Sequence, residues 1–191
     1  MRIAFKEWAV IVDALGHGDQ ILILRKGGIS EGRGGFKIEH SEFLLFPTLF
    51  HQQRDSVMPE AQTRYDQIAP LYLDAATLRI EYFVRVANSQ RLHELADAER
   101  LRGQHVWKDE VIAQRFDWGR DKSIYAMAVR VYRLPSAVIL PMSPAYGGCK
   151  SWIELEREID ITGAEPVLDE TAFASRLTAF KASLQLAGLP E

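Results

Sequence analysis

The sequence has a single cysteine, Cys149, among its 191 residues. An intramolecular disulfide and a zinc site built from several cysteines are therefore excluded. It also has no run of 18 apolar residues, so we expect no membrane-spanning helix. The start of the chain does not follow the pattern of a signal peptide, because Lys6 and Glu7 interrupt it at once. These absences predict a cytoplasmic protein with no membrane partner.

The composition is that of an ordinary globular protein, with 47% apolar and 26% charged residues. A chain of this length fits one domain, 1–191, without internal repeats or low-complexity segments. Such a domain buries enough apolar surface to fold without a disulfide or a structural metal. We therefore turn to the distribution of charge and to local patterns.

Charge is uneven along the chain. Residues 1–150 have 20 basic and 18 acidic side chains, whereas residues 151–191 have 3 basic and 8 acidic ones. A net charge of −3 gives no overall attraction for a polyanion, so nucleic-acid binding would need a local basic face. The acidic C-terminal region is a candidate surface for a protein partner.

Hydrophobic periodicity predicts a mixture of helices and strands. Expected helices cover 5–15, 60–68, 91–102, 108–116 and 170–187, and expected strands cover 20–25, 36–40, 43–46, 78–86, 123–141 and 153–155. For residues 9–25 a strand pair with a turn at 16–18 is an alternative. The order has no regular βαβ rhythm, which favours an α+β domain with a curved mixed sheet and flanking helices. An acidic helical segment, about 167–188, is expected to pack on it.

The densest polar segment is 25–55. Arg25 and Lys26 stand at the end of a predicted strand and are followed by a glycine-rich loop. Backbone N–H groups in such a loop approach an anion closely, and two cations strengthen that attraction. The spacing fits neither a Walker loop nor a dinucleotide fingerprint. We interpret the segment as an anion-binding candidate.

Two histidines, His40 and His51, flank the predicted strand 43–46. At opposite ends of a strand they would not share a metal, so no metal ligands are assigned. We expect them to act as hydrogen-bond donors or proton-transfer groups. Thr48 and Gln52 are expected to orient a ligand beside them.

A metal-dependent nuclease is an alternative. It would use Lys37 and Glu39, which alternation places on one strand face, together with Asp13 or Asp19 upstream. Mg²⁺ or Mn²⁺ would be the cofactor under this hypothesis alone, and no cofactor is expected otherwise. Cys149 lies between a glycine pair and Lys150. Its thiol is a candidate nucleophile, and the alternative is that it fills a small apolar space.

Several stretches resemble the bacterial domain-of-unknown-function family 1802. They are Phe5-Lys-Glu-Trp-Ala-Val, Ile23-Leu-Arg-Lys-Gly-Gly-Ile29, Glu39-His40, Phe43-Leu-Leu-Phe-Pro-Thr48, His51-Gln52, Val131-Tyr-Arg-Leu-Pro135 and Tyr146-Gly-Gly-Cys-Lys-Ser-Trp152. The resemblance spans nearly the whole chain and implies no activity. It implies that Lys6, Arg25, Lys26, His40, Thr48, His51, Gln52 and Lys150 belong to signature stretches.

A looser likeness is to PUA-like barrels, including the RNA-associated ASCH domains. The segments that resemble them are 15–25 and 125–140, although Asp19 stands where those domains often have a lysine. This likeness implies a PUA-like barrel as one form of the curved sheet.

The leading prediction is a cleft that binds RNA, single-stranded DNA or a nucleotide through Lys6, Arg25, Lys26 and Lys150. In that cleft His40 and His51 are the candidate proton-transfer groups. The alternatives are the nuclease, with Glu39 and Lys37 as candidate catalytic residues, and a protein-interaction or regulatory module.

Overall fold

Seven strands form one mixed sheet in the computed structural model, which describes residues 1–26, 38–119 and 121–185. The strands are β1 (Ile3–Trp8), β2 (Leu22–Arg25), β3 (Glu42–Thr48), β4 (Thr77–Leu92), β5 (Ile124–Pro141), β6 (Trp152–Glu154) and β7 (Glu165–Pro166). Six of them follow the order β2-β5-β4-β3-β1-β6, and β7 pairs with β5. The α+β fold with a curved mixed sheet is thereby confirmed.

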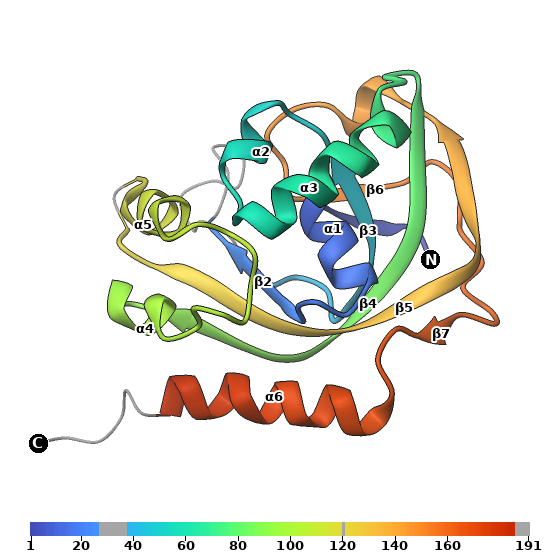
Figure 1. Ribbon diagram of the computed structural model, residues 1–191. Coiled ribbons are helices and arrows are strands. Elements are labelled where there is room, and N and C mark those ends of the chain that lie inside the picture. The colour runs from blue at the N-terminus through green and yellow to red at the C-terminus, as the bar shows by residue number, and fades with distance from the viewer. Residues whose placement is uncertain (27–37, 120, 186–191) are drawn as a thin grey trace, which may run out of the picture.

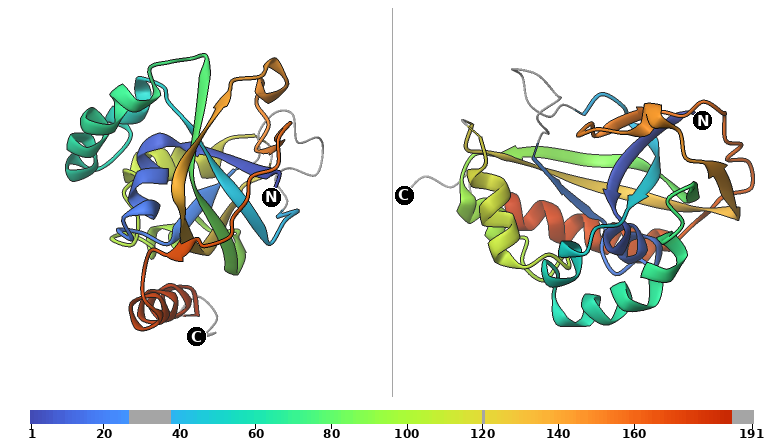
Figure 2. Two further views of the ribbon diagram at one scale, coloured as in Figure 1. Left: turned by 90° about the vertical axis from the view of Figure 1, so that its right-hand side faces the viewer. Right: turned by 90° about the horizontal axis from the view of Figure 1, so that it is seen from above.

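The helices connect and cover these strands. They are α1 (Ala9–Gly16), α2 (Gln52–Asp55), α3 (Pro59–Ile68), α4 (Leu95–Glu99), α5 (Asp109–Asp117) and α6 (Glu170–Gln185), with the 3₁₀ helices η2 (Ala69–Tyr72) and η3 (Pro144–Tyr146). Figure 1 shows α1 and α3 on the inner side of the long β4–β5 ribbon and α6 along its outer side. The left-hand view in Figure 2 shows the same separation of α3 and α6.

Long strands give the sheet its curvature. β4 and β5 pair over most of their length, with register shifts between Ile80 and Tyr82 and between Val86 and Asn88. Such irregularities bend a strand and increase its twist. The apolar alternation in 78–86 and 123–141 predicted both strands, although β4 continues further, to Leu92. The long arc of β4 and β5 in Figure 1 follows from this combination.

The expected helix over 5–15 is only half correct. Residues 3–8 form β1, which pairs in parallel with β3 from Ala4↔Leu44 to Trp8↔Thr48, and the helix begins at Ala9. The spacing of Phe5, Trp8, Ala9 and Val12 fits a helical face by coincidence. Pairing with a strand about 40 residues away decides the conformation, because tertiary context overrides a weak local preference. The alternative strand pair over 9–25 is also wrong for its first half.

Two other segments differ from expectation. The expected helix over 91–102 is wrong at its start, because β4 runs to Leu92 with that residue paired to Ile124, and α4 spans Leu95–Glu99. The expected strand over 36–40 is not formed at residues 38–40, whereas 36 and 37 lie outside the described residues. Charged and apolar positions alternate in both segments, so the pattern alone does not separate strand, helix and loop.

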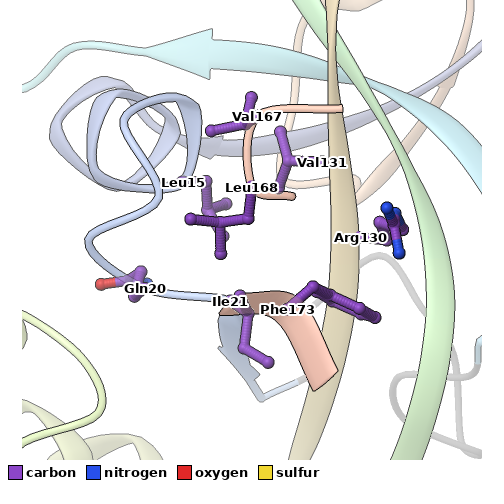
Figure 3. A pocket seen from close by; sticks show the side chains of 8 residues that line it. All are labelled: Leu15, Gln20, Ile21, Arg130, Val131, Val167, Leu168 and Phe173. Atoms are coloured by element: carbon purple, nitrogen blue, oxygen red, sulfur yellow. The ribbon is translucent and has the colours of Figure 1, made fainter. Parts of the chain in front are cut away.

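The C-terminal helix α6 lies along the outer side of the sheet (Figure 1). Asp169 caps α6, since its Oδ1 accepts a hydrogen bond of 2.8 Å from the Ala172 N–H. Three side chains of α6 itself, Phe173, Phe180 and Leu184, are buried in the core. Figure 3 shows the cavity at its start, where Phe173 and Leu168 meet Leu15. Its volume of about 10 Å³ is too small for an organic ligand.

Candidate anion-binding site

Three cations from three separate strands or turns meet beside a glycine turn. Lys6 lies in β1, Arg25 ends β2, and Lys150 lies in the turn before β6. The Lys6 ammonium donates a hydrogen bond of 3.0 Å to the Gly148 carbonyl. Arg25 donates two hydrogen bonds, of 3.1 and 2.8 Å, to the buried Ser151 hydroxyl. The Ser151 carbonyl in turn accepts the backbone N–H of Lys6 at 2.9 Å. We call Lys6, Arg25 and Lys150 the cationic cluster.

The electrostatics of Lys6 show how close these charges are. Burial lowers the pKa of Lys6, and the positive charges of Lys150 and Arg25 lower it further, while Cys149 acts in the opposite direction. Within 1–26, 38–119 and 121–185, no carboxylate forms an ion pair with any of the three cations. Adjacent cations without a paired carboxylate create a positive potential that attracts an anion.

Aromatic rings lie along one side of the cluster. The His40 ring contacts Trp152 edge-on, with centroids 5.1 Å apart, and Trp152 packs in the same way against Phe5 at 4.9 Å. The Arg25 guanidinium lies over the Phe5 ring at 5.2 Å. Shared neighbours therefore bring His40 to the same end of the sheet as Arg25. Of the residues singled out from the sequence, Lys6, Arg25, Lys150 and His40 are brought together.

Lys26 is used differently from its neighbour. Its ammonium donates hydrogen bonds to the carbonyls of Phe116, at 3.3 Å, of Ser123, at 2.8 Å, and of Asp121. Burial lowers its pKa, and the Asp121 carboxylate opposes that shift. These contacts link the end of α5 to the residues just before β5. The side chain of Lys26 thus holds the protein's own backbone.

Thr48, His51 and Gln52 follow β3. The Thr48 hydroxyl donates a hydrogen bond of 3.1 Å to the Glu7 carbonyl, across the β1–β3 pair. His51 precedes α2 and Gln52 is its first residue, and both side chains are exposed. His40 comes before β3 and His51 after it, so the two imidazoles lie beyond opposite ends of one strand.

The residues of the nuclease hypothesis are also placed in part. Glu39 is exposed before β3, and Lys37 lies outside the described residues. The Asp13 carboxylate in α1 is bound by both ends of the Arg64 guanidinium, at 3.0 and 2.9 Å, and Asp19 is exposed after that helix. The part of the chain that the structure describes contains no group of three histidine, cysteine or acidic side chains that could hold a metal ion.

A second arginine, which the sequence analysis did not select for the site, lies behind the cluster. The Arg115 guanidinium lies between Trp8, at 4.6 Å, and Trp107, at 5.1 Å, and donates a hydrogen bond of 2.8 Å to the Leu24 carbonyl. Burial lowers the pKa of Arg115 to about 10, although Glu7 raises it, and the charge of Arg25 lowers it further. Its selection would have required knowing that α5 returns to the end of β2.

Glu7 is the buried acidic partner of this region. It is 1% exposed, and its Oε1 accepts a hydrogen bond of 2.7 Å from the Trp8 N–H. Its Oε2 is buried and has no hydrogen-bond partner among the described residues. Glu7 points inward because residues alternate between the two faces of β1. A helix is expected over 5–15 from the sequence, so that alternation does not predict a buried Glu7. The charges of Glu7 and Arg25 both act on Arg115, and they act in opposite directions.

The protein has a curled mixed α+β sheet. Its cationic site lies where β1 and β2 meet the turn before β6. Residues 4–179 match the family described as Domain of unknown function (DUF1802), and the chain belongs to that family. No curated protein and no solved structure matches the chain. None of the helices in the described residues has the length and apolar character that crossing a bilayer requires.

Proposed function

We propose that the cationic cluster binds phosphate groups of RNA, single-stranded DNA or a nucleotide. The observation that carries this proposal is the convergence of Lys6, Arg25 and Lys150, each from a different part of the chain, with no paired carboxylate among the described residues. Cations that neutralise phosphates release condensed counterions, which drives the binding of nucleic acids. With a net charge of −3, such attraction is confined to a local site.

The neighbouring rings support a single strand over a duplex. His40 and Trp152 form an aromatic pair at the edge of the cluster. Exposed bases of a single strand stack on such side chains, whereas the bases of a duplex are already stacked on each other. His40 is half-buried, so part of its ring is accessible to a base. We therefore expect phosphate contacts from the cluster and base contacts from His40.

The test is binding of fluorescently labelled single strands, oligo-rU and oligo-dT, followed by anisotropy at several salt concentrations. Three phosphate contacts to a single strand predict a loss of affinity of about 20-fold between about 50 and 200 mM salt. Lys6→Ala, Arg25→Ala and Lys150→Ala should each weaken binding and lower the salt slope by about 0.7. Labelled ATP serves as the nucleotide probe.

The matched control is Lys181→Ala, which removes an exposed lysine from α6, away from the cluster. It should leave affinity and salt slope unchanged. Binding that is equally strong in the three cluster variants, or no binding of any probe at low salt, would contradict the proposal. The second result, with a protein partner recovered through the acidic region after residue 150, would favour an interaction module. Strand cleavage that requires Mg²⁺ or Mn²⁺ and is lost in Glu39→Ala would favour the nuclease.

A further inference from the structure

A cleft that shares no residue with the cationic cluster opens between α1, α3, η2, the first part of β4 and the middle of β5. Its volume is about 330 Å³, within the range of small-molecule sites. All of its lining residues lie in the described parts of the chain. Three arginines line it, Arg64, Arg79 and Arg133, together with two acidic residues, Asp13 and Glu81.

Two of the three arginines are neutralised within the cleft. Arg64 holds the buried Asp13 carboxylate through two hydrogen bonds, of 3.0 and 2.9 Å, and also contacts the His17 ring. Arg79 donates a hydrogen bond of 2.5 Å to Glu81. Paired in this way, these side chains form charged but balanced walls.

Arg133 is the unbalanced charge. Its Nη2 donates a hydrogen bond of 2.9 Å to the Gly16 carbonyl, and its guanidinium lies over the Tyr82 ring at 5.6 Å. None of the ion pairs between described residues involves Arg133. A guanidinium has five N–H donors in a planar fork that matches a carboxylate or a phosphate. Arg133 therefore keeps donors for an anion, while the Gly16 carbonyl and the ring and hydroxyl of Tyr82 hold it in place.

The floor beneath Arg133 is rigid. A Cβ at Gly16 would lie 2.3 Å from Cζ of Tyr82, so the tyrosine ring packs directly on the glycine backbone. The same glycine carbonyl accepts the Arg133 hydrogen bond. Close packing of this kind fixes the guanidinium before any ligand arrives, which reduces the entropy that binding costs.

One wall of the cleft is apolar. Ile68, Leu71 and Tyr72 line it, and Leu71 is 56% exposed. Burial raises the pKa of Tyr72, and the neighbouring Glu81 carboxylate raises it further, so its hydroxyl stays protonated at neutral pH. An apolar body placed on Leu71 would remove that side chain from water, which favours binding.

We infer that this cleft binds a small anion that carries a phosphate or carboxylate group on an apolar body. The anionic group lies on the guanidinium of Arg133, and the apolar body lies on Leu71 and Ile68. The paired charges of Arg64–Asp13 and Arg79–Glu81 line the walls without cancelling the charge of Arg133. This site is independent of the proposed nucleic-acid site.

The test is isothermal titration calorimetry of the full chain with three probes of similar size: phenyl phosphate, 3-phenylpropionate and the uncharged benzyl alcohol. At least one of the two anions should bind saturably, and the relative affinities show which anionic group the cleft prefers. Benzyl alcohol should bind at least about tenfold more weakly, because it offers no charge to Arg133. Equal binding of the alcohol, or no saturable binding of either anion at millimolar concentration, overturns the inference.

Variants then locate the site. Arg133→Gln should weaken anion binding at least about tenfold, and Arg133→Lys should give an intermediate affinity because it keeps the charge but loses the fork. Arg102→Gln, an exposed arginine outside the cleft, is the control and should change nothing. Unaltered anion binding in a folded Arg133→Gln protein overturns the inference. Oligonucleotide binding should persist in Arg133→Gln, so the two proposals succeed or fail separately.

Discussion

Arg25 and Ser151 are joined by two hydrogen bonds, of 3.1 and 2.8 Å, across 126 positions of sequence. The serine is fully buried, and its hydroxyl accepts both bonds from one charged group. Its backbone carbonyl also accepts the N–H of Lys6. One residue therefore orients two members of the cationic cluster.

Ser151→Ala should lower both stability and oligonucleotide affinity. Hydrogen bonds to charged groups contribute about 1.5–3 kcal/mol, so the free energy of unfolding should fall by about 2 kcal/mol. Affinity should fall because Arg25 loses the partner that orients it. Urea unfolding and anisotropy measure the two effects. Ser175→Ala, an exposed serine of α6, is the control; an equal loss there would show that the effect is not specific to Ser151.

As the pH rises, oligonucleotide binding should begin to weaken earlier than the ordinary pKa of a lysine predicts. Burial and the charges of Lys150 and Arg25 lower the pKa of Lys6 from 10.5, so its ammonium is lost earlier as the pH rises. Lys6→Arg keeps its charge throughout this range, because a guanidinium does not deprotonate there. Anisotropy titrations in alkaline buffers should therefore show a loss of affinity in the wild type that is smaller in Lys6→Arg. Identical profiles would show that the Lys6 charge does not take part.

Gly16→Ala should destabilise the protein. The added Cβ would lie 2.3 Å from Cζ of Tyr82, and overpacking of this kind costs about 1–3 kcal/mol. Tyr82→Leu removes the obstructing ring atoms. Gly16→Ala should therefore lower the free energy of unfolding less in the Tyr82→Leu protein than in the wild type. Urea unfolding of the four proteins gives the coupling free energy directly. Strict additivity of the two substitutions would refute the contact.

Stability should fall as the pH drops from about 6.5 to about 4. His105 is buried, and burial lowers its pKa from 6.5 to about 4, while the charge of Asp109 opposes that shift. In this range the unfolded chain binds a proton that the folded protein does not, so acid favours unfolding. A pKa shift of this size corresponds to about 3 kcal/mol in the free energy of unfolding. This stability is fully present above pH 6.5 and is lost as the pH falls towards 4.

The measurement is the free energy of urea unfolding as a function of pH in the wild type and in His105→Gln. The difference between the two curves should carry the slope assigned to His105, because all other titrating groups are shared. His93→Gln replaces an exposed histidine and serves as the control. Parallel curves for the wild type and His105→Gln would rule out this source of acid sensitivity.

Local pattern predicted the elements that stay close to their own periodicity. The alternation in β5 and the cap and apolar stripe of α6 are visible in the sequence because solvent and core face fixed sides of each. β1 was not visible, because its partner β3 lies about 40 residues away and its own spacing fits a helix equally well. Non-local pairing is information that one sequence without an alignment does not display.

The candidate site divides in the same way. Arg25 and Lys150 each lie two positions from a glycine, and Lys6 lies in a stretch that resembles the family, so the sequence points to these three. Arg115 was not selected for it, because its position beside Leu24 depends on a contact that spans 91 positions. Lys26 looks equivalent to Arg25 in the sequence, yet its ammonium is bound to the carbonyls of Phe116, at the end of α5, and of Ser123, just before β5. Adjacent residues at the end of a strand point to opposite faces, which accounts for the difference.

The pairing of β1 with β6 has a consequence for biosynthesis. Lys6 and Arg25 leave the ribosome early, but the segment that anchors both, residues 148–151, is translated more than a hundred positions later. A nascent chain that ends before residue 148 has these cations without their anchors. The complete cationic cluster therefore forms late in translation, and termination before residue 148 would yield fragments that lack it.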